Sequence, residues 1–136
     1  MSQEAIKKFV EYIKLQVFDD QYIDRVEERR ILESGIKDGI GVDKGLSIIR
    51  EVAIENGWVV ERLVEERAKE MLEQFAGNDG VVDKKEFDDA VGLFKKDSKG
   101  KVKEDDIKQR LKQIMLDNDW KAKEGGLFGS KWFSAI

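Results

Sequence analysis

Carboxylates are almost the only side chains in this sequence that could do chemistry. The chain has 29 Asp and Glu residues but no His and no Cys. Without imidazole or thiol groups it cannot form a Ser-His or Cys-His nucleophile pair, a zinc finger, a redox dithiol or a disulfide. The chemistry left to it is that of oxygen: binding cations, moving protons between carboxyl groups, or accepting hydrogen bonds from backbone amides.

Residues 75–86 match half of the twelve-residue calcium-binding loop. The matching residues, at loop positions five, six, eight, nine and twelve, are Asp79, Gly80, Val82, Asp83 and Glu86. Calcium prefers six to eight oxygen ligands, and Phe75 and Gly77 occupy two of the ligand positions. We therefore expect Asp79, Asp83 and Glu86 to bind calcium weakly or not at all.

The same residues have a structural interpretation. An Asp followed three residues later by a Glu, as at Asp83 and Glu86, is the signature of a capping box at a helix start. Capping stabilises a helix by ~1 kcal/mol without any ion, and we favour this interpretation. A second loop-like stretch, residues 95–106, has Lys95 and Lys99 where carboxylates would be needed, so it should not bind calcium.

Carboxylates are the only candidates for catalysis. They are the doublets Asp19-Asp20, Asp88-Asp89 and Asp105-Asp106 and the Glu-rich face of the fourth predicted helix. Adjacent residues of a helix lie about 100° apart around its axis, so a doublet does not form an acid–base dyad and is better explained as a solvated face. A metal enzyme built from carboxylates alone would need groups from different helices to converge. The prediction is that the chain is not an enzyme.

Helical spacing of apolar residues predicts an all-α fold of about six helices, arranged as helix-loop-helix pairs with turns like those of calcium loops. The chain has no Pro to interrupt them. The predicted helix starts are Ser2, Asp24, Asp43 and Asp83, and the predicted stops are Gly39, Asn56-Gly57 and Gly77.

Four short segments combine an aliphatic residue with a helix start. They are Ile23-Asp24, Val42-Asp43, Val82-Asp83 and Val102-Lys103. The second pair follows the first by 59 or 60 residues, as a duplicated helix-loop-helix unit would require. The alternative is that any helical bundle of this size repeats near this spacing.

The pattern changes after residue 119. We predict a helical domain over residues 1–119 and a Gly- and aromatic-rich segment over residues 120–136 that docks on it. The alternative is that this segment enters a groove of another protein. Trp58 either seals the core or anchors a partner. The predicted partner-binding residues are Trp58, Trp120, Leu127, Phe128, Trp132, Phe133 and Ile136.

The 136 residues carry a formal charge of −4, with Lys and Arg spread throughout. No basic stripe is present to neutralise phosphates, so nucleic acid is not expected as a partner. Charged residues interrupt the first seventeen positions, and no apolar run has the length of a membrane span. The expected location is the cytoplasm.

Residues 78–87, Asn-Asp-Gly-Val-Val-Asp-Lys-Lys-Glu-Phe, and residues 99–102, Lys-Gly-Lys-Val, resemble EF-hand proteins in degenerate form over roughly a quarter of the chain. Residues 20–27 and 79–86 also look similar to the acid-rich turns of the tellurite-resistance protein B superfamily. That resemblance implies a helical bundle with an acidic, metal-binding surface and a regulatory or scaffolding role.

Together these patterns predict a non-enzymatic adaptor that binds a protein through a hydrophobic groove between helices, with the C-terminal segment occupying the groove until a partner displaces it. No cofactor is expected apart from weakly bound calcium. The alternative function is a calcium-responsive sensor acting through residues 75–86.

Overall fold

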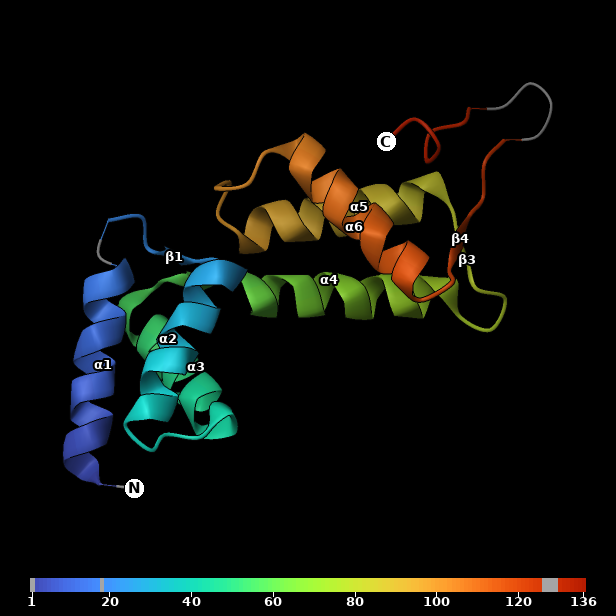
Figure 1. The fold of residues 1–136 in the computed structure, drawn as a ribbon. Helices are drawn as coiled ribbons and strands as arrows, with labels where there is room; N and C mark the ends of the chain where they lie inside the picture. The colour runs from blue at the N-terminus through green and yellow to red at the C-terminus, as the bar shows by residue number, and fades with distance from the viewer. Residues whose placement is uncertain (1, 18, 126–129) are drawn as a thin grey trace. The chain divides into compact units, whose positions relative to one another are not determined.

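In the computed structural model, residues 2–17, 19–125 and 130–136 are described, and they form six helices (Figure 1). The helices are α1 (Gln3–Val17), α2 (Arg25–Lys37), α3 (Val42–Asn56), α4 (Glu61–Ala76), α5 (Lys84–Asp97) and α6 (Glu104–Asp117). The all-α prediction is confirmed. Four two-residue strands, which the sequence did not predict, are β1 (Tyr22–Ile23), β2 (Val59–Val60), β3 (Val81–Val82) and β4 (Lys121–Ala122).

Side chains cap three of the helices as predicted. The Ser2 hydroxyl accepts a hydrogen bond from the Ala5 amide at 3.0 Å, at the start of α1. The carboxylate of Asp24 caps α2. At α5 the capping box is complete, because Asp83 accepts from the Glu86 amide at 2.7 Å and Glu86 accepts from the Asp83 amide at 3.0 Å.

The start of α3 differs from the prediction. The helix begins at Val42 after the N-cap residue Gly41, and no side chain caps it. Asp43 lies inside the first turn, where its negative charge faces the positive end of the helix dipole. The prediction that Asp43 is the N-cap is therefore wrong, because the N-cap is Gly41, two residues earlier.

The chain divides into two compact units, Met1–Arg62 and Leu63–Ile136. The first contains α1, β1, α2, α3 and β2; the second contains most of α4 and everything after it. The expected boundary between a helical domain and a C-terminal segment at residue 120 stays a prediction.

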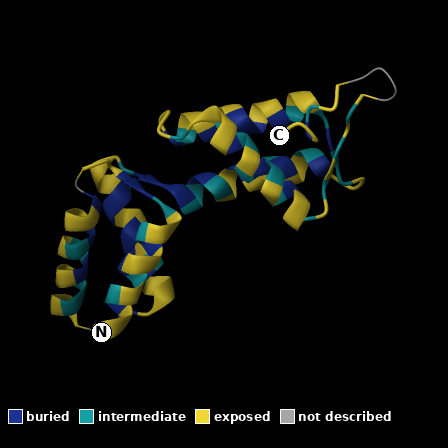
Figure 2. Cartoon of the chain, turned by 45° about the horizontal axis from the view of Figure 1, so that its top comes forward, coloured by how far each residue is buried: buried dark blue, intermediate teal, exposed yellow. Residues whose placement is uncertain are grey.

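The core of the first unit lies among α1, α2 and α3, where the buried faces of the helices meet (Figure 2). Its fully buried side chains include Ile13, Val17, Ile23, Ile31 and Ile49. Gly35 of α2 allows close packing, because a Cβ there would lie 2.8 Å from the ring of Phe9 in α1.

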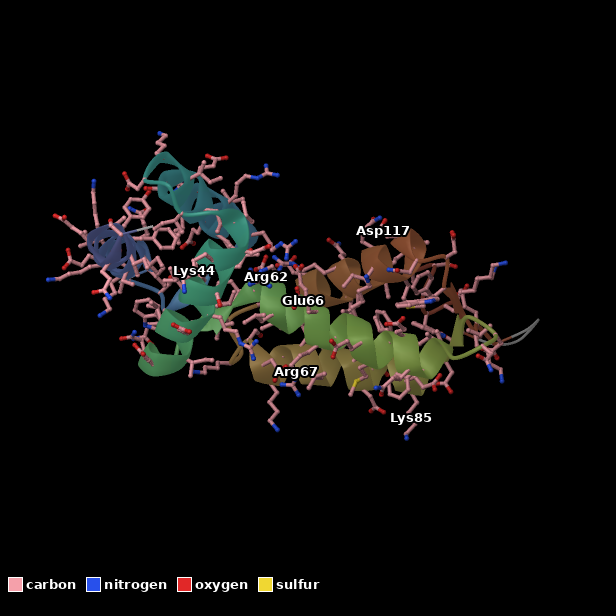
Figure 3. All side chains as sticks on the ribbon, turned by 90° about the horizontal axis from the view of Figure 1, so that it is seen from below. Lys44, Arg62, Glu66, Arg67, Lys85 and Asp117 are labelled. Atoms are coloured by element: carbon pink, nitrogen blue, oxygen red, sulfur yellow. The ribbon has the colours of Figure 1, made fainter. Side chains whose placement is uncertain are left out.

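The second unit packs α5 against α6, and its fully buried side chains include Leu72, Phe87, Phe94, Ile107, Leu111 and Met115. Two ion pairs join α4 to these helices. Arg67, labelled in Figure 3, lies 2.9 Å from a carboxylate oxygen of Asp97, and Arg110 lies 3.5 Å from Glu65.

Each unit is closed by a parallel strand pair. In the first, Tyr22 and Ile23 lie opposite Val59 and Val60; in the second, β3 pairs with β4. The paired strands precede and follow a helical hairpin, so they tie its two ends together. Val82 pairs with Ala122, which lies after the hairpin, and Val102 in the hairpin loop is in no strand.

Hydrogen bonds before the two hairpins are the same. The carboxylate of Asp20 accepts from the amide two residues on, at 3.2 Å, and Asp79 does so at 3.0 Å. The next residue, Gln21 or Gly80, has a positive φ of 56° or 69°. Its carbonyl accepts from the strand that follows the hairpin, at 3.0 Å from Val59 and 2.7 Å from Lys121.

The ends of the hairpins also match. The side chains of Asn56 and Asn118 donate to carbonyls four residues back, at 2.8 and 2.7 Å. The amides of Trp58 and Trp120 donate to carbonyls five residues back, both at 2.9 Å. The two halves therefore share a repeat of a helix, a strand, two helices and a strand. The predicted match of Val42 with Val102 is wrong by two positions, because the N-caps Gly41 and Lys103 correspond, as do Asn56 and Asn118.

Candidate functional site

The second unit carries an aromatic cluster where the C-terminal residues meet α5. Residues 130–136, here called the C-terminal hook, place Trp132 with its ring centroid 5.1 Å from that of Phe87. The Phe133 ring meets Phe87 edge-on at 6.2 Å and Trp132 at 5.6 Å. These are favourable aromatic geometries, and they leave Phe87 only 1% exposed.

A lysine of α6 holds the backbone of the hook. The Nζ atom of Lys112 donates to the carbonyl oxygen of Phe133 at 3.0 Å and to that of Ile136 at 3.2 Å. It also lies 5.0 Å from the centroid of the Phe133 ring, within the range of a cation–π contact. One ammonium group thus fixes both the chain and a ring of the hook.

Residues after β4 fix the other side of the hook. The Trp132 indole donates to the Lys123 carbonyl at 3.2 Å, and the Ser134 hydroxyl donates to a Glu124 carboxylate oxygen at 2.8 Å. The bond from Ser134 stabilises the ionised form of Glu124, which lowers the pKa of that carboxyl.

The residues predicted to bind partners lie in different places. Phe133 is buried in the hook, and Trp132 and Ile136 are half-buried there. Trp58 and Trp120 are half-buried at the ends of α3 and α6, at matching positions of the two repeats. Leu127 and Phe128 lie outside the described residues. A hollow of about 410 Å³ beside the hook is lined by Asp105, Lys108, Gln109, Trp132, Ala135 and Ile136.

The acidic residues predicted as weak calcium ligands all accept bonds from backbone amides. Asp83 and Glu86 form the capping box, and Asp79 accepts from the Val81 amide at 3.0 Å. Among the described residues, no group of three or more Asp and Glu side chains is arranged to hold a metal ion. Weak or absent calcium binding at residues 75–86 stays a prediction.

The first unit has an open groove along α2. The groove has a volume of about 550 Å³ and is here called the α2 groove. Its lining residues are Arg25, Val26, Glu28, Arg29, Leu32, Glu33, Ile36 and Val42. Three of its apolar side chains are unusually exposed for their type: Val26 at 66%, Ile36 at 52% and Val42 at 47%.

The matching positions of the second unit show that the fold does not need these apolar residues. Val26 corresponds to Lys85, and Ile36 corresponds to Lys95. Lys85 is exposed on α5 and its side chain extends away from the helix (Figure 3). Lysine is the residue expected on a solvated face, so valine and isoleucine at these positions make this face of α2 more apolar than the matching face of α5.

One of the charges that line the α2 groove, the carboxylate of Glu28, is neutralised by an arginine of the same unit. Glu28 is only 6% exposed, and the Nε atom of Arg62 donates to both its carboxylate oxygens, at 3.2 and 3.0 Å. Pairing of this kind offsets the cost of burying the carboxylate. The rim carries exposed Arg25, Arg29 and Glu33. The side of the groove nearest solvent is therefore basic on balance.

A carboxyl pair stands at the start of α2. Asp24 accepts the hydrogen bond from the Glu27 amide at 2.7 Å. Burial, a side-chain hydrogen bond with Asp24 and the negative charges of Asp24 and Asp20 raise the pKa of Glu27 to about 7. Glu27 therefore exchanges its proton near neutral pH, next to the groove-lining residue Glu28.

Sequence reasoning missed the α2 groove because apolar periodicity assigns Ile36 to the buried face of its helix. The signal that could have revealed it was the repeat itself. Aligning the two halves sets Val26 against Lys85 and Ile36 against Lys95, and two such exchanges on one helix mark a face that differs between the copies.

Comparison of the chain with protein-family models, with curated proteins and with solved structures finds no match. Among the described residues, no helix has the length and apolar character needed to cross a membrane.

Proposed function

We propose that the protein is a non-enzymatic interaction module that binds a partner protein through the α2 groove. The observation that carries the proposal is the exposure of Val26, Ile36 and Val42 in one hollow. An apolar face rimmed by charged residues is typical of a surface that another protein covers.

The second unit supports this proposal by contrast. Its hairpin has the same caps and strand closure, yet it carries lysine at the positions of Val26 and Ile36. Its central rings, Phe87 and Phe133, are covered within the chain, and Leu116 of α6 is exposed by itself, at 50%. The first unit is thus the one that gathers exposed apolar side chains in a single hollow.

The test uses a variant that copies the second unit. In Val26→Lys with Ile36→Lys the hairpin should remain folded, because lysine already occupies both matching positions. Proteins retained from cell extract by the natural chain should be lost from this variant. A purified candidate should then bind the natural chain in calorimetry and bind the variant at least about 10-fold more weakly.

Leu15→Lys is the matched control. Leu15 is 77% exposed on α1 and does not line the groove, so this variant adds a lysine at an apolar site that is more exposed than Val26 or Ile36. It should bind the partner as the natural chain does. Equal binding by the natural chain and by the double-lysine variant would refute the proposed site.

A further inference from the structure

The C-terminal hook is an addition to the repeat and not a part of its frame. The first unit has a capped hairpin and a parallel strand pair like those of the second. At the position of Phe87 it has Glu28, whose carboxylate is held by two hydrogen bonds from Arg62 instead of by aromatic rings. Because the frame forms in that copy without a hook, the second unit should stay folded when its hook leaves.

The hook lies on a surface, here called the seat, that Phe87 of α5 and Lys112 of α6 form. Among residues 130–136 only Phe133 is buried, and Trp132 is half-buried. The bonds from side chains of the hook to residues 123 and 124 are exposed, so water competes with them. A segment held in this way can leave the seat while the helices beneath it stay packed.

The contacts of the hook show which chemistry the seat accepts. Two adjacent rings, those of Trp132 and Phe133, pack on Phe87 with centroids 5.1 and 6.2 Å away. Lys112 donates to two carbonyl oxygens of the same segment and lies over the Phe133 ring. All of these contacts involve a ring pair and a backbone, so a segment of another polypeptide with the same ring pair can make them too.

The hook leaves part of its surroundings unfilled. The hollow of about 410 Å³ lies beside it, lined by Ala135 of the hook and by Lys108 and Gln109 of α6. A large apolar side chain at the position of Ala135 would reach into this hollow and gain contacts that alanine lacks. The hook of a second copy would leave the same space, so a partner segment with a larger residue there is the better occupant.

We infer that the seat is a second docking site, for a segment of a partner polypeptide. The segment has two adjacent aromatic residues and, two positions after the second ring, a large apolar residue in place of Ala135. The hook competes with it from within the chain, because a tethered segment has an effective concentration on the order of mM. A partner segment that fills the hollow displaces the hook, and the α2 groove plays no part in this binding.

The probe is a synthetic peptide of residues 130–136 with Ala135→Leu, and its counterpart keeps Ala135. Each is titrated into the ¹⁵N-labelled full-length chain and into the full-length Trp132→Ala, Phe133→Ala variant, here called the ring-less variant. Both peptides should shift amide signals of residues 84–112 in the ring-less variant, and the leucine peptide should bind at least about 3-fold more tightly. The natural chain should bind each peptide at least about 10-fold more weakly, because its own hook competes.

Further variants locate the site and open it in a second way. Added to the ring-less variant, Lys112→Glu should abolish binding, whereas Lys85→Glu, an equal charge change at an exposed position of α5, should not. Ser134→Glu in the natural chain keeps both rings but sets a carboxylate against Glu124, to which the Ser134 hydroxyl now donates at 2.8 Å. It should strengthen peptide binding toward that of the ring-less variant, and Ser130→Glu should not.

Three results would overturn the inference. If the ring-less and Ser134→Glu variants both lose the dispersed spectrum of a folded second unit, the hook belongs to the core. If the natural chain and the ring-less variant bind the peptides equally, the hook does not compete for the seat. If sedimentation shows a dimer of the natural chain that the ring-less variant loses, the occupant is the hook of a second copy and not a partner.

Discussion

Glu28 and Phe87 occupy the same position in two copies of one repeat, but the side chain at this position makes different contacts in each copy. In the first unit the position holds a carboxylate that pairs with Arg62 at the edge of an open groove. In the second it holds a ring covered by Trp132 and Phe133. The frame around both positions, made of caps and paired strands, is the same.

Comparing the two copies distinguishes the residues that stabilise the repeat from the residues on its outer face. The paired elements, such as Asp24 with Asp83 and Trp58 with Trp120, make the same backbone hydrogen bonds in both copies. The residues that differ lie on the outer face of the hairpin. A duplicated frame can thus present an open surface in one copy and a covered one in the other.

The largest expected effect comes from removing the ring at the centre of the covered face. Phe87→Ala should lower the free energy of unfolding of the second unit by about 3–5 kcal/mol, because it deletes a fully buried ring and two ring contacts. Urea unfolding followed by tryptophan fluorescence measures it. Leu116→Ala, at a half-exposed position of α6, should change stability by less than about 1 kcal/mol.

A smaller effect is expected in the first unit, where Glu28 occupies the position of Phe87 and pairs with Arg62. Arg62→Ala should cost about 2 kcal/mol, since it leaves the buried Glu28 carboxylate without its partner. This is below the usual cost of breaking a buried pair because the Arg62 side chain is 18% exposed. Adding Glu28→Leu should recover most of the loss; a double variant as unstable as the single one would contradict the pairing argument.

The smallest expected effect is a dependence of stability on pH, caused by Glu27 at the start of α2. Burial and the neighbouring carboxylates raise the pKa of Glu27 from its ordinary 4.5 to about 7, so between these values only the folded state keeps the proton. The free energy of unfolding should therefore fall as pH rises from about 4.5 to 7, by about 1 kcal/mol or less because Glu27 is substantially solvated. In Glu27→Gln the free energy of unfolding should change less with pH over this interval. If the free energies of the variant and of the natural chain change with pH in parallel, Glu27 is not the group responsible.

Local signals in the sequence were sufficient for the helices. The spacing of Asp24 from Glu27 and of Asp83 from Glu86 correctly located two helix starts, because capping involves residues three apart. The 59-residue offset correctly matched Asp24 with Asp83, but the 60-residue offset expected for the next helix was wrong, because its N-cap Gly41 matches Lys103. Asp43 was misplaced because Gly41, which has no side chain to accept a bond, takes the N-cap position with an extended backbone.

Features that depend on distant residues were not predictable. Val59 and Val60 form a strand only because Tyr22 and Ile23 lie beside them, and two residues are too few to show an alternating pattern. The hook was expected to dock, but nothing in its sequence specified Phe87 or Lys112 as its contacts. The α2 groove was hidden because exposure of Ile36 is a property of the assembled helices.

The parallel strand pairs have an architectural consequence. Entry and exit run side by side in the same direction, so another copy can follow the last strand without reversing the chain, as α4 follows β2. In the second unit the Trp132 indole donates to the carbonyl of Lys123, the residue directly after β4, so the hook also fixes the position of the chain where it leaves the strand pair.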